Sequence, residues 1–198
     1  GFEAQFAGKK ITLLGLGLLG RGVGDAEFLA SCGAAVTVTD RKSEKELAPS
    51  IERLKHIPNI EFHLGGHVED DFTRADMVIK AAGVRLDSQE KAKAKKAGVP
   101  VAMSTALFAK IAMDGGAKIV GVTGTRGKST ISHMIFHVLK SAGKRVHLGG
   151  NVRGLSTLAM LPSVEAGDIA VLELDSWQLQ GFGELARSPH VAVFSNLM

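Results

Sequence analysis

The chain has 198 residues, 45% of them hydrophobic, and its formal net charge is +4. This size and apolar content suffice for one large or two small globular domains, whereas the longest apolar run, residues 11–20, is too short and too rich in glycine to span a bilayer. With one cysteine, one tryptophan and no tyrosine, the chain has neither an internal disulfide nor the aromatic residues of a base-stacking surface, so we expect a cytoplasmic protein that binds small anions rather than nucleic acid.

Short runs rich in β-branched residues alternate with helix-patterned stretches, which is typical of parallel α/β units. In the first part of the chain the expected strands are residues 11–14, 35–39, 61–64, 77–80 and 99–103. A helical stretch then begins at Ser104 and ends in Asp114-Gly115-Gly116, a stop and turn signal. We therefore place a domain boundary there, with a first domain over residues 1–115.

The second domain, residues 116–198, repeats the pattern with expected strands at 118–123, 145–148, 168–174 and 190–194. Its first helix carries apolar residues at helical spacing, namely Ile131, Met134, Ile135, Val138 and Leu139. Three or four strands make a sparse sheet. The pattern thus predicts only part of a second α/β domain.

The stretch IVGVTGTRGKST, residues 119–130, joins a predicted strand to a predicted helix and ends like a phosphate-binding loop. Val122 stands where the common G-x-x-x-x-G-K-[ST] signature has its first glycine. The loop amides can nevertheless bind phosphate oxygens, Lys128 adds a cation for the outer phosphates, and Ser129 or Thr130 offers a hydroxyl to Mg²⁺. The predicted ATP-binding residues are Gly124, Thr125, Arg126, Gly127, Lys128, Ser129 and Thr130.

A nucleotide triphosphatase also needs a carboxylate for its metal at the end of a neighbouring strand. In DIAVLELDSWQ, Glu173 and Asp175 are two residues apart and would face the same way in an extended strand. The alternative is that both carboxylates reach solvent where the strand ends.

The first domain contains GLGLLG, a G-x-G-x-x-G motif with Gly15, Gly17 and Gly20 between a predicted strand and helix. Asp40 ends the next strand, at the place where a dinucleotide-binding fold has its ribose-binding acid. Together these features favour a nucleotide site over close packing alone.

Three further features have structural explanations. His133 and His137 have the spacing of a helical metal pair, but Met134 stands where a zinc protease has its glutamate. Residues 91–96, KAKAKK, fit a solvated helix face. The segment GGN, residues 149–151, either lines the phosphate cleft or forms a plain turn.

These motifs resemble those of the Mur ligases of peptidoglycan synthesis. GTRGKST resembles the central-domain loop of that family, GGNVRG its Gly-Gly-Asn-x-Gly segment, and LELDSWQL its L-E-L-S-S-F-Q-L metal strand. GLGLLG and TDR are similar to the UDP-binding domain of the member that adds D-glutamate to UDP-N-acetylmuramoyl-L-alanine. The resemblance implies a Rossmann-like domain followed by the first part of a P-loop ATPase-type domain.

The resemblance also implies a reaction: ATP phosphorylates the substrate's terminal carboxylate, and the amine of D-glutamate attacks the acyl phosphate. Lys128, Asn151 and Glu173 would be the catalytic residues, and Ser129 and Glu173 would bind Mg²⁺, with Asp175 as a further candidate. The residues implied for the UDP substrate are Gly15, Gly17, Leu18, Leu19, Gly20, Asp40, Arg41, Gly83 and Asn151.

Some residues depart from the family's pattern. Arg126 replaces a frequent asparagine, Asp175 and Trp177 replace serine and phenylalanine, and residues 81–83, AAG, replace Ser-Pro-Gly. The family's remaining central-domain residues and its amino-acid-binding domain would lie beyond residue 198. We therefore expect a monomeric front portion of a ligase that is inactive alone. The alternatives are an NAD-dependent oxidoreductase built on GLGLLG and Asp40, and a non-catalytic nucleotide-binding module.

Overall fold

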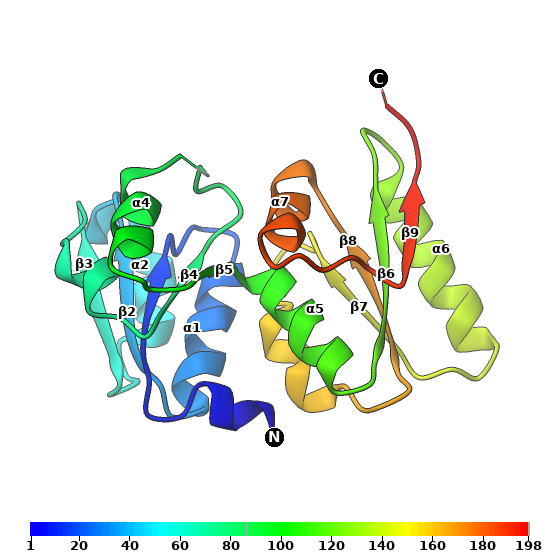
Figure 1. The fold of residues 1–198 in the computed structure, drawn as a ribbon, viewed down its shortest axis with the longest axis horizontal. Coiled ribbons are helices and arrows are strands. Elements are labelled where there is room, and N and C mark those ends of the chain that lie inside the picture. Colours follow the sequence, from blue (N-terminus) through cyan, green and yellow to red (C-terminus); the bar gives the residue numbers. More distant parts are fainter. Residues whose placement is uncertain (86, 198) are drawn as a thin grey trace. The chain divides into compact units, whose positions relative to one another are not determined.

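The computed structural model describes residues 1–85 and 87–197, and the chain divides into two compact units, Gly1–Ser104 and Thr105–Met198 (Figure 1). Each unit is a parallel β-sheet with helices on both faces, so the predicted α/β class is confirmed. Among the described residues, no helix combines the length and the apolar character needed to cross a bilayer.

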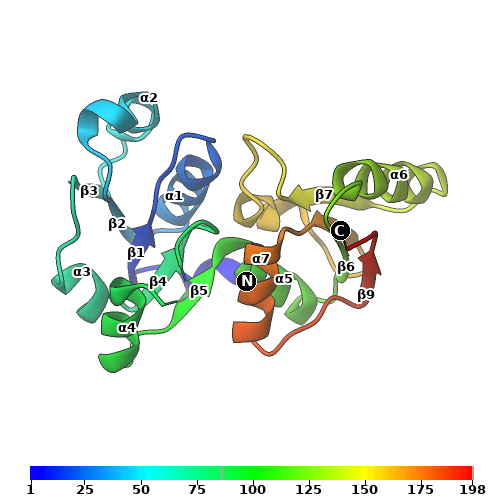
Figure 2. The ribbon, with the colours of Figure 1, turned by 90° about the horizontal axis from the view of Figure 1, so that it is seen from above.

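The first unit is a five-stranded sheet in the order β3-β2-β1-β4-β5. Its strands are β1 (Lys10–Leu14), β2 (Ala35–Asp40), β3 (Ile60–Leu64), β4 (Met77–Lys80) and β5 (Val101–Met103). Figure 2 shows helices α1 (Arg21–Ser31) and α2 (Glu44–Leu54) on one face, and α3 (Asp70–Thr73) and α4 (Gln89–Lys96) on the other. The strand order reverses between β1 and β4, which is where open α/β sheets form their ligand crevice.

The core of this sheet explains why the predicted strands form. Strands buried on both faces read as nearly continuous apolar runs, and in β1 the run from Ile11 to Leu14 is buried throughout. On the face covered by α3 and α4, Leu14 and Val78 pack with Phe72 and Ala94. Each residue of this cluster is almost fully removed from water, which favours folding by the hydrophobic effect.

The second unit is a four-stranded parallel sheet in the order β7-β8-β6-β9. Its strands are β6 (Lys118–Thr123), β7 (Val146–Gly150), β8 (Ile169–Glu173) and β9 (Val191–Phe194). Helix α6 (Lys128–Ser141) covers one face, and α5 (Ser104–Asp114) and α7 (Ser176–Glu184) lie on the other (Figure 2).

The units divide at the start of α5, whereas the sequence placed the boundary after this helix, at residue 115. One hydrogen bond joins α5 to α7, and one ion pair joins α5 to the segment after α7. Gln178 Nε2 donates to Thr105 Oγ1 at 3.0 Å, and the Arg187 guanidinium pairs with Asp114 at 3.1 Å. The turn signal at residues 114–116 therefore marks the end of a helix, not the end of a unit.

The apolar stripe predicted for α6 is only partly right. Ile131, Ile135 and Leu139 pack against the sheet core, but Met134 and Val138 are 61% and 66% exposed. The row at i, i+4 and i+8 packs on the strands, and Ser132, next to Ile131, is fully buried.

Candidate nucleotide-binding sites

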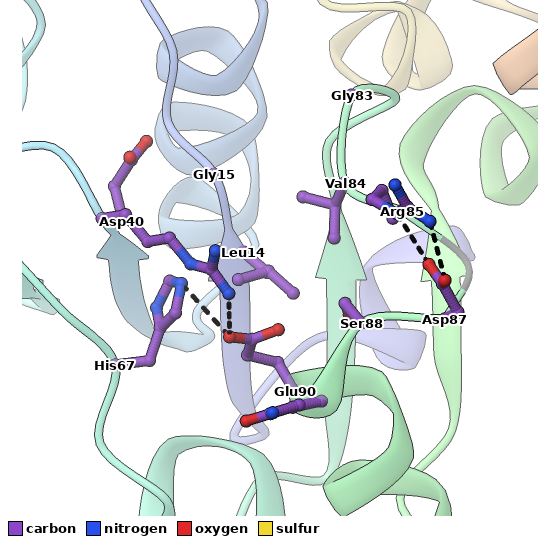
Figure 3. A pocket seen from close by; sticks show the side chains of 12 residues that line it. Leu14, Gly15, Asp40, His67, Gly83, Val84, Arg85, Asp87, Ser88 and Glu90 are labelled. Atoms are coloured by element: carbon purple, nitrogen blue, oxygen red, sulfur yellow. Dashed lines mark hydrogen bonds and ion pairs between the residues drawn. The ribbon is translucent and has the colours of Figure 1, made fainter.

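A pocket of about 520 Å³ opens in the first unit, beyond the carboxyl ends of β1, β2 and β4 (Figure 3). It brings together four of the residues predicted for the UDP substrate, namely Gly15, Asp40, Arg41 and Gly83. The other predicted residues of this unit, Gly17, Leu18, Leu19 and Gly20, lie along the glycine loop outside the pocket lining.

The glycine loop that follows β1 depends on residues with positive φ. Gly15, Gly17 and Gly20 have φ values of +91°, +66° and +82°, in the left-handed region that side chains disfavour. Gly20 is the N-cap of α1. The sequence reasoning missed Gly22, where a Cβ would overlap the carbonyl of Leu16, so this glycine lets the helix approach the loop closely.

Asp40 holds the glycine loop in place. Its Oδ2 accepts hydrogen bonds from the backbone N–H of Leu16 at 2.9 Å and of Gly17 at 3.4 Å, and its Oδ1 accepts one from Lys42 at 2.9 Å. In Figure 3 the Asp40 carboxylate points away from Glu90. The acid predicted to bind the ligand is thus engaged by three backbone donors of its own unit.

A second carboxylate, which sequence reasoning missed, lines the pocket wall. Arg41 donates to Glu90 Oε1 at 2.8 Å, and His67 Nε2 lies 3.8 Å from the same oxygen (Figure 3). His67 Nδ1 in turn lies 2.8 Å from Thr39 Oγ1. Glu90 and His67 belong to no motif, so only the fold shows that they meet Arg41.

The environment sets the charges of this group. Burial opposes ionisation of Glu90, but its hydrogen bonds to Arg41 and to the backbone, with the nearby positive charge, bring its pKa below the ordinary value. Burial lowers the pKa of His67, against the pull of Glu90. At neutral pH the pocket therefore presents a paired Arg41 cation and Glu90 anion beside a neutral imidazole.

In the second unit, the phosphate loop connects β6 to α6 as predicted. Gly124 and Gly127 have φ values of +136° and +80°, and Gly127 is the N-cap of α6. Lys128 Nζ donates to the carbonyls of Gly124 at 2.9 Å and Thr125 at 3.3 Å, so the ammonium lies over the loop. The first amides of a helix have no intrahelical partner, and here they stand beside this cation. This arrangement suits a phosphate group.

The donor set beside this loop fits Mg²⁺. Val171 of β8 packs with α6, and Glu173, two residues on, faces the same side of the sheet. Ser129 is the second residue of α6. Glu173 is nearly buried. A carboxylate and a hydroxyl are hard oxygen ligands, and Mg²⁺ in nucleotide sites takes one or two such protein ligands beside the phosphates.

Asp175 and Asn151 have defined structural positions. Strand β8 ends at Glu173, and Asp175 is the N-cap of α7, where its Oδ1 accepts the Gln178 N–H at 2.8 Å. This bond explains Asp175 without a metal. Asn151 follows β7, and its N–H donates to the Glu173 carbonyl at 2.7 Å. The GGN segment therefore adjoins the predicted metal carboxylate.

Further contacts near the phosphate loop involve residues outside the predicted nucleotide site. His133 Nδ1 lies 2.7 Å from the Ser129 carbonyl, and among the described residues no group of three or more His, Cys, Asp or Glu side chains is arranged to hold a metal. The sequence reasoning also missed Ser195 and Asn196, which follow β9 and bond to the phosphate loop.

A glycine-loop unit followed by a phosphate-loop unit matches known protein domains. Residues 9–103 match the Mur ligase MurD-like N-terminal domain, and residues 122–198 match the Mur ligase middle domain. The chain belongs to the Mur ligase family.

Two curated relatives of the chain carry the name of the same member of that family. The chain is 38% identical over 193 residues to the UDP-N-acetylmuramoylalanine–D-glutamate ligase of Roseiflexus sp. (strain RS-1). That alignment covers 98% of this chain and 40% of the relative. It is 37% identical to the enzyme of the same name from Borreliella afzelii, over 93% of this chain and 39% of the relative. The chain thus spans about two fifths of these relatives.

Solved structures support the fold. The UDP-N-acetylmuramate-alanine ligase of Thermotoga maritima aligns with 96% of this chain at a TM-score of 0.56 and 24% identity, over 41% of its own length. A UDP-N-acetylmuramate:L-alanyl-gamma-D-glutamyl-meso-diaminopimelate ligase from Neisseria meningitides gives a TM-score of 0.58 at 18% identity, covering 96% of this chain and 61% of its own.

Proposed function

We propose that this chain supplies the UDP-substrate-binding and ATP-binding domains of a ligase that adds D-glutamate to UDP-N-acetylmuramoyl-L-alanine. The observation that carries the proposal is the pairing, on one chain, of a glycine-loop pocket with a phosphate loop that has a buried strand-end carboxylate. Relatives bearing the name of this ligase align with nearly the whole chain. We place the activity in the cytoplasm and in a monomer.

In the first unit, the diphosphate of the substrate would bind at the glycine loop, beside the N-terminus of α1, where backbone amides and the helix dipole favour an anion. The uracil would occupy the pocket beyond β1, near Asp40 and Arg41. Asp40 contributes by fixing the loop through its bonds to Leu16 and Gly17.

In the second unit, the amides of the loop and of the first turn of α6 would hold the ATP phosphates, and Lys128 would exchange its loop carbonyls for the outer phosphates. Ser129 and Glu173 would hold Mg²⁺, which offsets phosphate charge when bound. A carboxylate oxygen of the substrate attacks the γ-phosphorus and ADP leaves. The amine of D-glutamate then attacks the acyl carbon, and phosphate and a proton are released. Asn151 would lie near the transferred group.

Calorimetry with two ligands tests this proposal. UDP-N-acetylmuramoyl-L-alanine should bind the chain, and MgATP should bind with the same affinity whether or not the first ligand is present at saturation. Competition between the two ligands would contradict the assignment of one site to each unit. Failure of both to bind a correctly folded chain would contradict the function itself.

A further inference from the structure

The two residues after β9 form a brace against the phosphate loop. Asn196 accepts the Thr125 N–H through its backbone carbonyl at 2.9 Å and the Arg126 N–H through its side-chain Oδ1 at 3.0 Å. Ser195 Oγ donates to the Arg126 carbonyl at 2.6 Å, and Asn196 Nδ2 lies 3.4 Å from that same oxygen. The backbone N–H and the backbone carbonyl of Arg126 are therefore both bonded to this brace.

The fit between the brace and the loop is close. Ser195 N–H donates to the Thr123 carbonyl at 2.9 Å, which continues the pairing of β9 with β6 up to the loop. At Gly124, where φ is +136°, a Cβ would overlap Ser195 Oγ and lie 3.0 Å from the Asn196 backbone nitrogen. The loop can approach the brace only because this residue is glycine.

We infer that Ser195 and Asn196 are positioning residues for the triphosphate, an inference that rests on the function proposed for the second unit. They act on the ligand through the loop rather than by touching it. The neighbouring β9 thereby becomes part of the machinery that shapes the ATP site.

The brace decides which backbone N–H groups of the loop are available to bind phosphate. A phosphate loop binds its ligand through backbone N–H groups. Here the N–H groups of Thr125 and Arg126 are directed at Asn196, so phosphate would be bound by the other amides of the loop, by those of the first turn of α6 and by the Lys128 ammonium. Lys128 itself rests on the Gly124 and Thr125 carbonyls, so the brace also fixes the seat of this cation.

The variants Asn196→Ala and Ser195→Ala test the inference, with Asn59→Ala as a matched control. Asn59 is also an amide that clamps backbone, donating to the Ala30 and Ala34 carbonyls at 3.0 and 2.7 Å, but it lies in the first unit. The readouts are MgATP affinity, UDP-N-acetylmuramoyl-L-alanine affinity, thermal stability, and hydrogen exchange of the Arg126 amide by NMR.

We expect Asn196→Ala to weaken MgATP binding by about tenfold and to speed exchange at Arg126 by a similar factor, since one hydrogen bond is worth roughly that much. Its UDP-ligand affinity should equal that of the wild type. Ser195→Ala should weaken MgATP binding less. Asn59→Ala should lose stability without losing MgATP affinity.

Wild-type MgATP affinity and unchanged Arg126 exchange in Asn196→Ala would overturn the inference, as would equal losses of MgATP affinity in Asn196→Ala and Asn59→Ala. If the wild-type chain binds no MgATP, the proposed function fails. In that case Ser195 and Asn196 cannot be positioning residues for ATP. The exchange rate of the Arg126 amide in Asn196→Ala still decides whether the brace holds the loop.

Discussion

The backbone of Gly150 lies directly against that of Glu173, where β7 and β8 end side by side. Gly150 has a φ of +89°, and a Cβ at this position would overlap the Glu173 carbonyl oxygen. The next residue, Asn151, donates its N–H to that oxygen at 2.7 Å. Because Gly150 has no side chain, the end of β7 can lie against the backbone of the residue that carries the predicted metal carboxylate.

Replacement of Gly150 should consequently be severe. Gly150→Ala combines an unfavourable φ with a backbone overlap, and we expect a loss of about 3 kcal/mol in the free energy of unfolding, measured by urea denaturation. Gly154→Ala is the control, because Gly154 has a φ of +76° with open space around it. It should cost only about 1 kcal/mol. Equal costs would show that the close approach to Glu173 does not matter.

Lys128→Ala should separate ATP binding from folding. The ammonium contacts only loop carbonyls in the described structure, so its removal should change stability little while MgATP affinity falls by about a hundredfold, as expected when the main cation for the outer phosphates is lost. Lys140→Ala on the same helix removes an equal charge that lies over Phe136 instead. A Lys128→Ala protein that binds MgATP as tightly as Lys140→Ala would show that the loop is assigned wrongly.

Asp40→Asn should weaken binding of the UDP ligand through the glycine loop. An amide has one oxygen, so it cannot accept all the N–H groups of Leu16, Gly17 and Lys42 as the carboxylate does. We expect a loss of about 1–3 kcal/mol in stability and weaker binding of UDP-N-acetylmuramoyl-L-alanine, with MgATP affinity unchanged. Unaltered UDP-ligand affinity in the folded variant would remove Asp40 from the site.

The sequence predicts local features well because they depend on nearby residues. The apolar runs of the strands, the glycine turn between β1 and α1, and the loop from Gly124 to Lys128 all follow from composition and spacing. These are confirmed at the level of backbone structure.

Long-range relationships were not accessible from spacing. The Gln178 bond to Thr105 that places α5 in the second unit joins residues 73 positions apart, and the Asn196 bond to Arg126 joins residues 70 positions apart. The meeting of Glu90 with Arg41 likewise depends on where α4 begins relative to the end of β2. Only the tertiary fold brings such groups together.

Stability should depend on pH through His63. Its hydrogen bond to Asp71, at 2.8 Å, raises the pKa of the imidazole above the ordinary value, although partial burial opposes this. The resulting stabilisation is complete below the unfolded-state pKa of about 6.5 and is lost as pH rises through the higher folded-state pKa. The difference in unfolding free energy between wild type and His63→Gln should therefore shrink from about pH 5.5 to pH 8.5. A difference that grows with pH would contradict this coupling.

We expect the first unit to bind a UDP-sugar, although its glycine motif also suits a dinucleotide. In a dehydrogenase the strand-end acid accepts bonds from the adenosine ribose, whereas Asp40 here is bonded by three backbone donors. Calorimetric titration of the chain with UDP-N-acetylmuramoyl-L-alanine and with NAD is the most direct test. We expect measurable binding of the UDP-sugar and no binding of NAD. Tight NAD binding with no response to the UDP-sugar would contradict it and identify an oxidoreductase domain.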